Sequence, residues 1–286
     1  MKILIAGVAG LIGHHLARSL ARHHQVTALT HGALDITDGD AVRRRVFDGR
    51  FSLVVNCAVL QVDASEANPG KAQAVNIEGP RNLAAAANKV GAELVHFSTQ
   101  YAFAGEPIGR RPYTVDDETG PVNVYGRTKL AGEEAVKEKC ARSYLIRTSW
   151  VYGSGKNSFL CTVYNDLCAG KRVRAIDDVW SSTTYVKDLI DRLLLILRAG
   201  CHDTYHVVNE GVLSYYEFAL EAGRLAGLNR EKLEPLIEIV KEADMKRPAA
   251  RPRYTPLRCL NSEKLGFPPM RQWRDALAAY VRMSRP

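Results

Sequence analysis

The chain has 286 residues, of which 46% are hydrophobic and 24% are charged. This composition indicates a soluble globular protein and excludes a disordered, collagen-like or disulfide-scaffold chain. The 39 Lys and Arg residues outnumber the 31 Asp and Glu residues, which gives a formal net charge of +8. A basic balance of this size is typical of proteins that bind nucleic acid or membrane surfaces and of enzymes for phosphorylated substrates.

Short apolar runs alternate with helical patterns along the first half of the chain. Strands are predicted over residues 2–6, 25–30, 53–56, 93–98 and 143–148. Helices are predicted between them, over residues 11–21, 38–47, 71–90 and 122–140. Continuous apolar strands that alternate with helices are typical of a parallel sheet covered on both faces. The sequence therefore predicts an α/β fold with a doubly wound, Rossmann-type parallel sheet.

The regular alternation fades after Tyr152. Further helices are expected near residues 157–169, 186–199, 215–226 and 273–283, with a short strand over residues 204–208. We expect one domain over residues 1–152, to which later segments return, and a smaller C-terminal lobe over residues 153–286.

A glycine-rich turn joins the first strand to the first helix. Its sequence runs from Gly7 through Gly10, Leu11 and Ile12 to Gly13. The first glycine permits a tight turn, the second lets the backbone approach a pyrophosphate, and the third lets helix and strand pack closely. The free N–H groups of the helix N-terminus then face the phosphates. A turn of this composition need not bind a ligand, but its place between a strand and a helix favours a dinucleotide site.

The G-x-x-G-x-x-G spacing resembles the extended class of short-chain dehydrogenases/reductases, which acts on nucleotide sugars. In dinucleotide-binding folds an acidic residue near the end of the second strand holds the ribose of NAD, whereas this chain has Thr30 and His31 there. Because no carboxylate would repel a 2′-phosphate, NADPH is at least as plausible as NADH, with a slight preference for NADPH. The resemblance implies that Asp35 and Ile36 contact the adenine, although Asp35 could instead cap the next helix.

Tyr125 and Lys129 lie four residues apart in a predicted helix. This spacing places both side chains on one helix face. A tyrosine has an unperturbed pKa of about 10, and a neighbouring cation favours its phenolate. The preceding strand ends at Thr99, which offers a hydroxyl at the carboxyl edge of the sheet, where open α/β folds bind ligands. A Tyr and Lys at this spacing are often only surface residues, but the three groups in this order favour a catalytic set.

Five further segments resemble one particular family within this class. They are residues 54–58, 76–79, 97–99, 123–133 and 147–153. Together they resemble the dTDP-4-dehydrorhamnose reductase family over nearly the whole chain. The resemblance implies that Thr99, Tyr125 and Lys129 are catalytic and that residues 1–152 bind a reduced nicotinamide cofactor. It also implies roles for further residues: Cys57 and Ala58 at the cofactor, and Gln100, Trp150, Asn157 and Arg251 at the substrate.

Three segments depart from the family pattern. Gln100 stands where the family usually has Asp, residues 58–63 are one residue shorter than usual and lack a threonine, and residues 180–184 lack the usual Gly and Pro. These changes leave the nucleotide sugar and the product stereochemistry open more than the type of reaction.

The predicted reaction is reduction of the 4-keto group of a nucleotide-activated 6-deoxysugar. Tyr125 would protonate the forming alkoxide, Lys129 would hold the nicotinamide ribose and lower the pKa of the tyrosine, and Thr99 would hydrogen-bond the carbonyl oxygen. A nucleotide-sugar 4-epimerase stays an alternative, whereas a 4,6-dehydratase is disfavoured because Gln100 does not supply an acid. A non-catalytic subunit similar to the regulatory subunit of methionine adenosyltransferase is the alternative from another class.

The expected partner is a nucleotide-diphosphate sugar. Scattered basic residues without interleaved aromatics disfavour nucleic acid, and no apolar stretch reaches the roughly 18 residues of a membrane span. The six cysteines form no C-x-x-C pair and the eight histidines form no ligand cluster, so no metal site is expected. Unpaired thiols suit a reducing cytoplasm. Some reductases of this type dimerise, and the sequence leaves a homodimer open.

Overall fold

The computed structural model describes residues 1–106, 111–155 and 158–284. A parallel sheet of six strands forms its centre, in the order β10-β5-β4-β3-β1-β2. Its strands are β1 (Lys2–Ala6), β2 (Gln25–Leu29), β3 (Leu53–Asn56), β4 (Glu93–Thr99), β5 (Ser143–Thr148) and β10 (Thr204–His206). Strand order reverses between β1 and β3, which is the doubly wound arrangement. The predicted α/β fold is confirmed.

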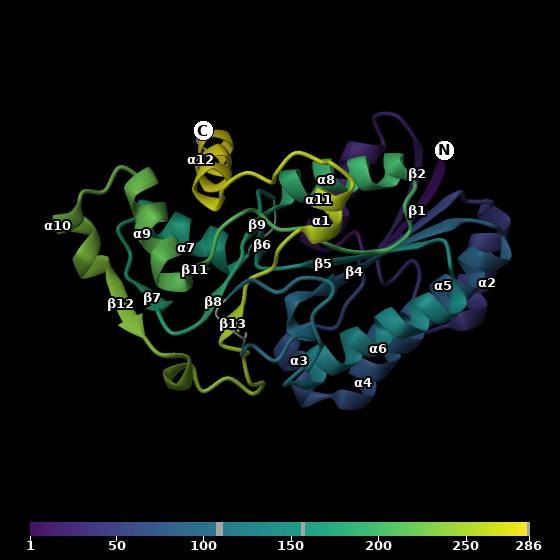
Figure 1. Ribbon diagram of the computed structural model, residues 1–286, viewed down its shortest axis with the longest axis horizontal. Helices are drawn as coiled ribbons and strands as arrows, with labels where there is room; N and C mark the ends of the chain where they lie inside the picture. Colours follow the sequence, from purple (N-terminus) through teal and green to yellow (C-terminus); the bar gives the residue numbers. More distant parts are fainter. Residues whose placement is uncertain (107–110, 156–157, 285–286) are drawn as a thin grey trace.

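Helices cover both faces of this sheet (Figure 1). One face carries α2 (Gly39–Gly49), α5 (Gly79–Lys89) and α6 (Val124–Lys139), and the other carries α1 (Leu11–Leu20) and α8 (Val186–Ala199). Each face has its own apolar cluster, and the cluster around α1 and α8 continues into the C-terminal lobe. The two halves of the chain therefore share one of the two cores.

The prediction of a single helix over residues 71–90 is wrong in detail. The structure has α4 (Pro69–Gln73), a π-helical turn η1 (Ala74–Glu78) and then α5. A short helix, α3 (Val62–Ala67), precedes them and was not predicted. Within the π turn, the Asn76 side chain bonds the backbone of Leu60 and the hydroxyl of Thr128. These contacts between distant segments leave no trace in the apolar periodicity, which is why the sequence misses the irregular turn.

The C-terminal lobe consists of small sheets and helices beside the main sheet (Figure 1). Its strands are β6 (Val151–Tyr152), β7 (Val173–Ile176), β8 (Trp180–Ser181), β9 (Thr184–Tyr185), β11 (Leu213–Ser214), β12 (Ile237–Val240) and β13 (Tyr254–Thr255). Its helices are α7 (Phe159–Cys168), α9 (Tyr215–Leu225), α10 (Arg230–Leu233) and α12 (Trp273–Ser284), with the 3₁₀ turns η4 (Glu234–Leu236) and η5 (Glu242–Met245). Helix α11 (Leu260–Lys264) packs on β10 of the main sheet, and the 3₁₀ turn η2 (Gln100–Ala102) follows β4.

Two C-terminal elements begin or end where local hydrogen bonds require it. Helix α7 starts at Phe159, later than predicted, because the Ser158 hydroxyl caps it by accepting from the Cys161 N–H. Strand β10 is shorter than its predicted range and pairs in parallel with β5, which returns this segment to the main sheet.

Among the described helices, none is long and apolar enough to cross a membrane.

Candidate active site

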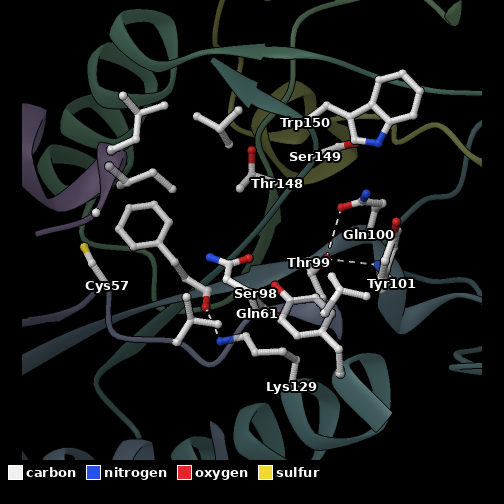
Figure 2. Close-up of a pocket in the computed structure, with 18 of the residues that line it drawn as sticks. Cys57, Gln61, Ser98, Thr99, Gln100, Tyr101, Lys129, Thr148, Ser149 and Trp150 are labelled. Atoms are coloured by element: carbon white, nitrogen blue, oxygen red, sulfur yellow. Dashed lines mark hydrogen bonds between the residues drawn. The ribbon is translucent and has the colours of Figure 1, made fainter. Parts of the chain in front are cut away.

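A pocket of about 680 Å³ opens at the carboxyl ends of β1, β3, β4 and β5 (Figure 2). Its walls include Gly10 after β1, Cys57 after β3, Thr99 at the end of β4 and Trp150 after β5. This volume is typical of sites for cofactors and small molecules, and the position is the crevice where doubly wound sheets bind ligands. The fold thus brings residues from four strand ends into one site.

The glycine turn forms one wall of the pocket. Gly7 has a φ of +85°, and a Cβ there would lie 2.5 Å from the Ala58 nitrogen, so the turn is packed tightly against the segment after β3. A Cβ at Gly13 would lie 2.6 Å from the Gly7 carbonyl oxygen, which prevents a side chain where α1 packs on the turn. At Gly10 the nearest atom would be the Gly7 oxygen at 3.5 Å, and Gly10 faces the pocket. A side chain at Gly10 would therefore fill the pocket and not the protein interior.

Helix α1 begins directly at this wall. Its N-cap, Gly10, provides no side-chain hydrogen bond, and its first turn contains no acidic residue. Leu11, Ile12 and Gly13 line the pocket at the positive end of the helix dipole. A backbone cradle without side chains at a helix N-terminus fits a dinucleotide pyrophosphate.

The remaining cofactor residues predicted near strand two lie outside the pocket lining. Thr30 and His31 are exposed just after β2. Asp35 accepts hydrogen bonds from the Thr37 N–H and hydroxyl at 2.9 and 2.8 Å, and the N–H bond in particular lowers the pKa of the Asp35 carboxyl. Ile36 is 3% exposed and packs in the apolar cluster under α2 and α5. The contact of Asp35 and Ile36 with an adenine stays a prediction, as does the role of Thr30 and His31 at the cofactor.

Tyr125 reaches the pocket because the start of α6 is fixed from two sides. The Asn123 side chain caps the helix by accepting from the Gly126 N–H at 2.7 Å and also donates to the Ala250 carbonyl at 2.7 Å. Gly126 lies so close to the Tyr101 carbonyl that a Cβ would clash with it. The missing side chain at Gly126 therefore lets the first turn of α6 approach the end of β4.

Thr99 is held by hydrogen bonds with its two neighbours in the chain. The Thr99 hydroxyl donates to Gln100 Oε1 at 3.1 Å and accepts from the Tyr101 N–H at 3.2 Å, as Figure 2 shows. Burial raises the pKa of Tyr125 to about 12, and a hydrogen bond with Thr99 opposes this rise. Gln100 is 5% exposed and lines the pocket together with both predicted catalytic hydroxyls.

Lys129 lines the pocket and is almost fully buried, with 2% of its surface exposed. Its Nζ donates to the Phe97 carbonyl at 2.6 Å and lies 3.1 Å from His96 Nε2. Desolvation lowers the pKa of Lys129 to about 8, although Glu133 and Cys57 act in the other direction. The hydrogen bond to Phe97 thus holds the lysine against β4, where it forms part of the pocket wall (Figure 2).

The opposite wall of the pocket is aromatic. Trp150 lies across the pocket from Lys129 in Figure 2 and stacks on Tyr215, with ring centroids 3.8 Å apart. Its φ of +36° is unusual for a bulky residue. Such a backbone is typical of a side chain whose position is required by function.

Arg251 does not line the pocket directly. Its guanidinium forms two 2.8 Å bonds to the Asp63 carboxylate and one of 2.7 Å to the Ala249 carbonyl. The Arg251 hydrogen bond lowers the pKa of Asp63. Asn157 lies outside the described residues.

Comparisons with known proteins agree on one family. The family described as RmlD substrate binding domain matches residues 1–285. A dTDP-4-dehydrorhamnose reductase from Mycolicibacterium smegmatis is 43% identical over 280 residues, which cover 96% of this chain and 84% of that protein. The chain belongs to the dTDP-4-dehydrorhamnose reductase family. The resemblance predicted from the motifs is confirmed.

Solved structures of dTDP-4-dehydrorhamnose reductases superpose over the whole chain. One from Clostridium acetobutylicum has a TM-score of 0.91 and 34% identity, with 99% of each chain covered. Another, from Bacillus anthracis and in complex with NADP, has a TM-score of 0.92 and 30% identity, again with 99% of each chain covered. The family fold therefore extends over nearly the whole chain.

Several residues that line the pocket of this chain were not predicted from the sequence. Gln61, Tyr101, Ser149 and Tyr215 line the pocket, and His96 contacts Lys129 from beneath. Only His96 left a readable signal, because it is a polar residue inside the otherwise apolar run of a buried strand. Within the described residues, no group of three or more His, Cys, Asp or Glu side chains is arranged to hold a metal ion.

Proposed function

We propose that this protein is an NADPH-dependent reductase of the 4-keto group of a dTDP-activated 6-deoxysugar. The observation that carries the proposal is that Thr99, Tyr125 and Lys129 line the same pocket as the glycine turn. The related enzyme crystallised with NADP supports the choice of cofactor. When bound, NADPH supplies the hydride for the reduction.

The cofactor is held by the turn and the adjacent strand ends. The N–H groups at Leu11, Ile12 and Gly13 hold the pyrophosphate, and Gly10 leaves room for it. The other cofactor residues are Gly7, which shapes the turn, Cys57 and Ala58 beside it, Thr30 and His31 at the 2′-phosphate, and Asp35 and Ile36 at the adenine.

The proton required by the reduction comes from Tyr125. Thr99 lies beside Tyr125 in the pocket, and its hydroxyl turns from Gln100 to donate to the substrate carbonyl, which it orients without protonating it. Lys129 binds the nicotinamide ribose and, once positively charged, lowers the pKa of Tyr125 from its raised value. The three groups thus divide the work into orientation, proton donation and electrostatic activation.

The sugar lies between the catalytic residues and the aromatic wall. Trp150 offers a flat apolar surface, and Gln100 offers a neutral amide donor in place of a carboxylate. Arg251 and Asn157 act at the substrate in this proposal, as the family resemblance implies. In this proposal residues 1–152 are the dinucleotide-binding domain and residues 153–286 are mainly the substrate-binding lobe, and the enzyme works in the cytoplasm, with a homodimer as a compatible assembly.

The test is turnover with a panel of 4-keto nucleotide sugars. NADPH oxidation is followed by absorbance and the product is identified by NMR. We expect stoichiometric oxidation of NADPH and a sugar with a hydroxyl at C4. Retention of tightly bound NAD with interconversion of C4 epimers would contradict the proposal, as would tight binding to a synthetase without any turnover.

A further inference from the structure

Lys129 is the end of a buried hydrogen-bond chain that begins at the turn after β3. The Ala58 N–H donates to Asn56 Oδ1 at 3.0 Å, and Asn56 Nδ2 lies 3.1 Å from His96 Nδ1. His96 Nε2 in turn lies 3.1 Å from Lys129 Nζ. Asn56 and His96 are each at most 1% exposed, so bulk water does not replace these partners.

The direction of each hydrogen bond follows from the number of donors and acceptors. The bond from Ala58 fixes the Asn56 amide, so its NH₂ group faces His96 and can only donate. His96 Nδ1 must then be an acceptor without a hydrogen. A neutral imidazole with a bare Nδ1 carries its hydrogen on Nε2. That hydrogen points toward Lys129.

An ammonium group at Lys129 does not fit this arrangement. It has three donors and no acceptor, so it would oppose one N–H with another. The reverse imidazole tautomer would relieve the conflict only if the Asn56 amide turned over, and the Ala58 N–H would then lose its acceptor. A neutral amine satisfies every group, because its lone pair accepts from His96 while an N–H donates to the Phe97 carbonyl.

The charges around Lys129 do not restore the ammonium. Four titratable groups face it, namely Cys57, His96, Tyr125 and Glu133. Glu133 is the strongest of them, but it forms a buried bidentate pair with Arg147. Burial raises the pKa of the Cys57 thiol to about 12 and lowers the pKa of His96 far below its usual range.

Carboxylates on the other elements packed against α6 have their own partners. Glu66 of α3 accepts from the Val124 N–H at 3.0 Å, and Glu78 of η1 pairs with Arg81. Burial also raises the pKa of Tyr101, in η2, to about 12. No uncompensated carboxylate among the described residues is therefore placed to hold a positive charge on Lys129.

We propose that His96 is a positioning residue that favours the neutral amine of Lys129 in the cofactor-free protein at mildly alkaline pH, so that dinucleotide binding there takes up as much as one proton from solvent at this lysine. The proton adds to the lone pair that accepted from His96, and the negative phosphates of the dinucleotide favour the resulting ammonium. The free site rests in a form that cannot activate Tyr125, and loading of the cofactor creates the activating charge. This inference rests on the proposed cofactor role of the pocket.

The first test is the imidazole tautomer in the free protein. Two-bond proton–nitrogen spectra of the ¹⁵N-histidine protein at pH 8.5 should show His96 with its hydrogen on Nε2. A hydrogen on Nδ1 would overturn the proposal. This readout requires neither cofactor nor substrate, so it separates the proposal from the proposed function: failure to bind any dinucleotide would contradict the function, while the tautomer would still decide the role of His96.

The second test is proton uptake on NADPH binding, measured by calorimetry at pH 8.5 in buffers of different ionisation enthalpy. With the pKa of Lys129 at about 8, we expect uptake of more than half a proton per site. The 2′-phosphate does not contribute, because its second pKa lies near 6. NADPH binding without uptake would contradict the proposal.

Variants separate the role of His96 from general stability. His96→Gln supplies a carbonyl acceptor for an ammonium, and we expect proton uptake to fall below a quarter of the wild-type value. His206→Gln is the matched control, because His206 is a buried histidine on the neighbouring part of the sheet, 1% exposed and outside the pocket lining. It should keep the wild-type uptake.

A second variant covers the case in which His96→Gln does not fold. Asn56→Asp replaces the amide by an acceptor-only group, which reverses the tautomer and favours the ammonium, and uptake should again be lost. Wild-type uptake in a folded His96→Gln or Asn56→Asp protein would overturn the proposal.

Discussion

Gly10 and Gly13 lack side chains for different structural reasons, and this difference gives a matched test of the phosphate cradle. At Gly10 a Cβ would have one neighbour, the Gly7 oxygen at 3.5 Å, and the φ of −81° suits any residue. At Gly13 a Cβ would lie 2.6 Å from the Gly7 oxygen and 2.9 Å from Val8 Cα. Both of those are backbone atoms, which cannot turn aside as the end of a side chain can.

We therefore expect Gly10→Val to fold, with a loss of about 1 kcal/mol at most from the weaker N-cap. Its side chain occupies the pocket, so the Kd for NADPH should rise at least tenfold, or about 1.4 kcal/mol. Gly13→Ala should instead lose about 1–3 kcal/mol of stability through overpacking. Calorimetric titration and urea unfolding measure the two quantities. Unchanged NADPH affinity in Gly10→Val would refute the assignment of the cradle, and an undisturbed stability in Gly13→Ala would refute the packing argument.

Three further outcomes are expected. Thr99→Val should lower kcat by about tenfold, less than loss of the tyrosine hydroxyl, because one hydrogen bond is removed while the acid stays; an equal loss in steady-state assays would contradict the division of roles. NADPH should bind at least as tightly as NADH, since Thr30 and His31 offer no carboxylate, and a preference for NADH above about tenfold in calorimetry would refute this. Arg147→Met should cost about 3–5 kcal/mol in urea unfolding, because the buried Glu133 loses its ion-pair partner; a cost below about 1 kcal/mol would show that the pair is not structural.

The sequence patterns predict the parts of this protein that local chemistry determines. The apolar strands predict the parallel sheet, and the G-x-x-G-x-x-G turn is found at a strand end, as expected. Tyr125 and Lys129 share a helix face because of their spacing alone, and both reach the predicted pocket. Thr99 joins them because parallel strands end at one edge of the sheet.

Contacts between distant segments account for what the sequence did not reveal. The partner of Arg251 is Asp63, 188 positions away, in a helix too short to be predicted. Tyr215 reaches the pocket only because the C-terminal lobe folds back so that it stacks on Trp150. No periodicity encodes such pairings, since they depend on how the lobe docks on the sheet.

The central claim is that Tyr125 donates the proton in reduction of a keto sugar. Phenylalanine at this position keeps the ring and its edge-to-face contact with Tyr101, whose ring centroid lies 5.9 Å away, and removes only the hydroxyl. The decisive measurement is kcat of Tyr125→Phe with NADPH and a confirmed dTDP-4-keto-6-deoxysugar, together with its NADPH affinity. The account predicts a kcat lower by about 10²–10⁴-fold at unchanged affinity, and turnover near the wild-type rate would contradict it.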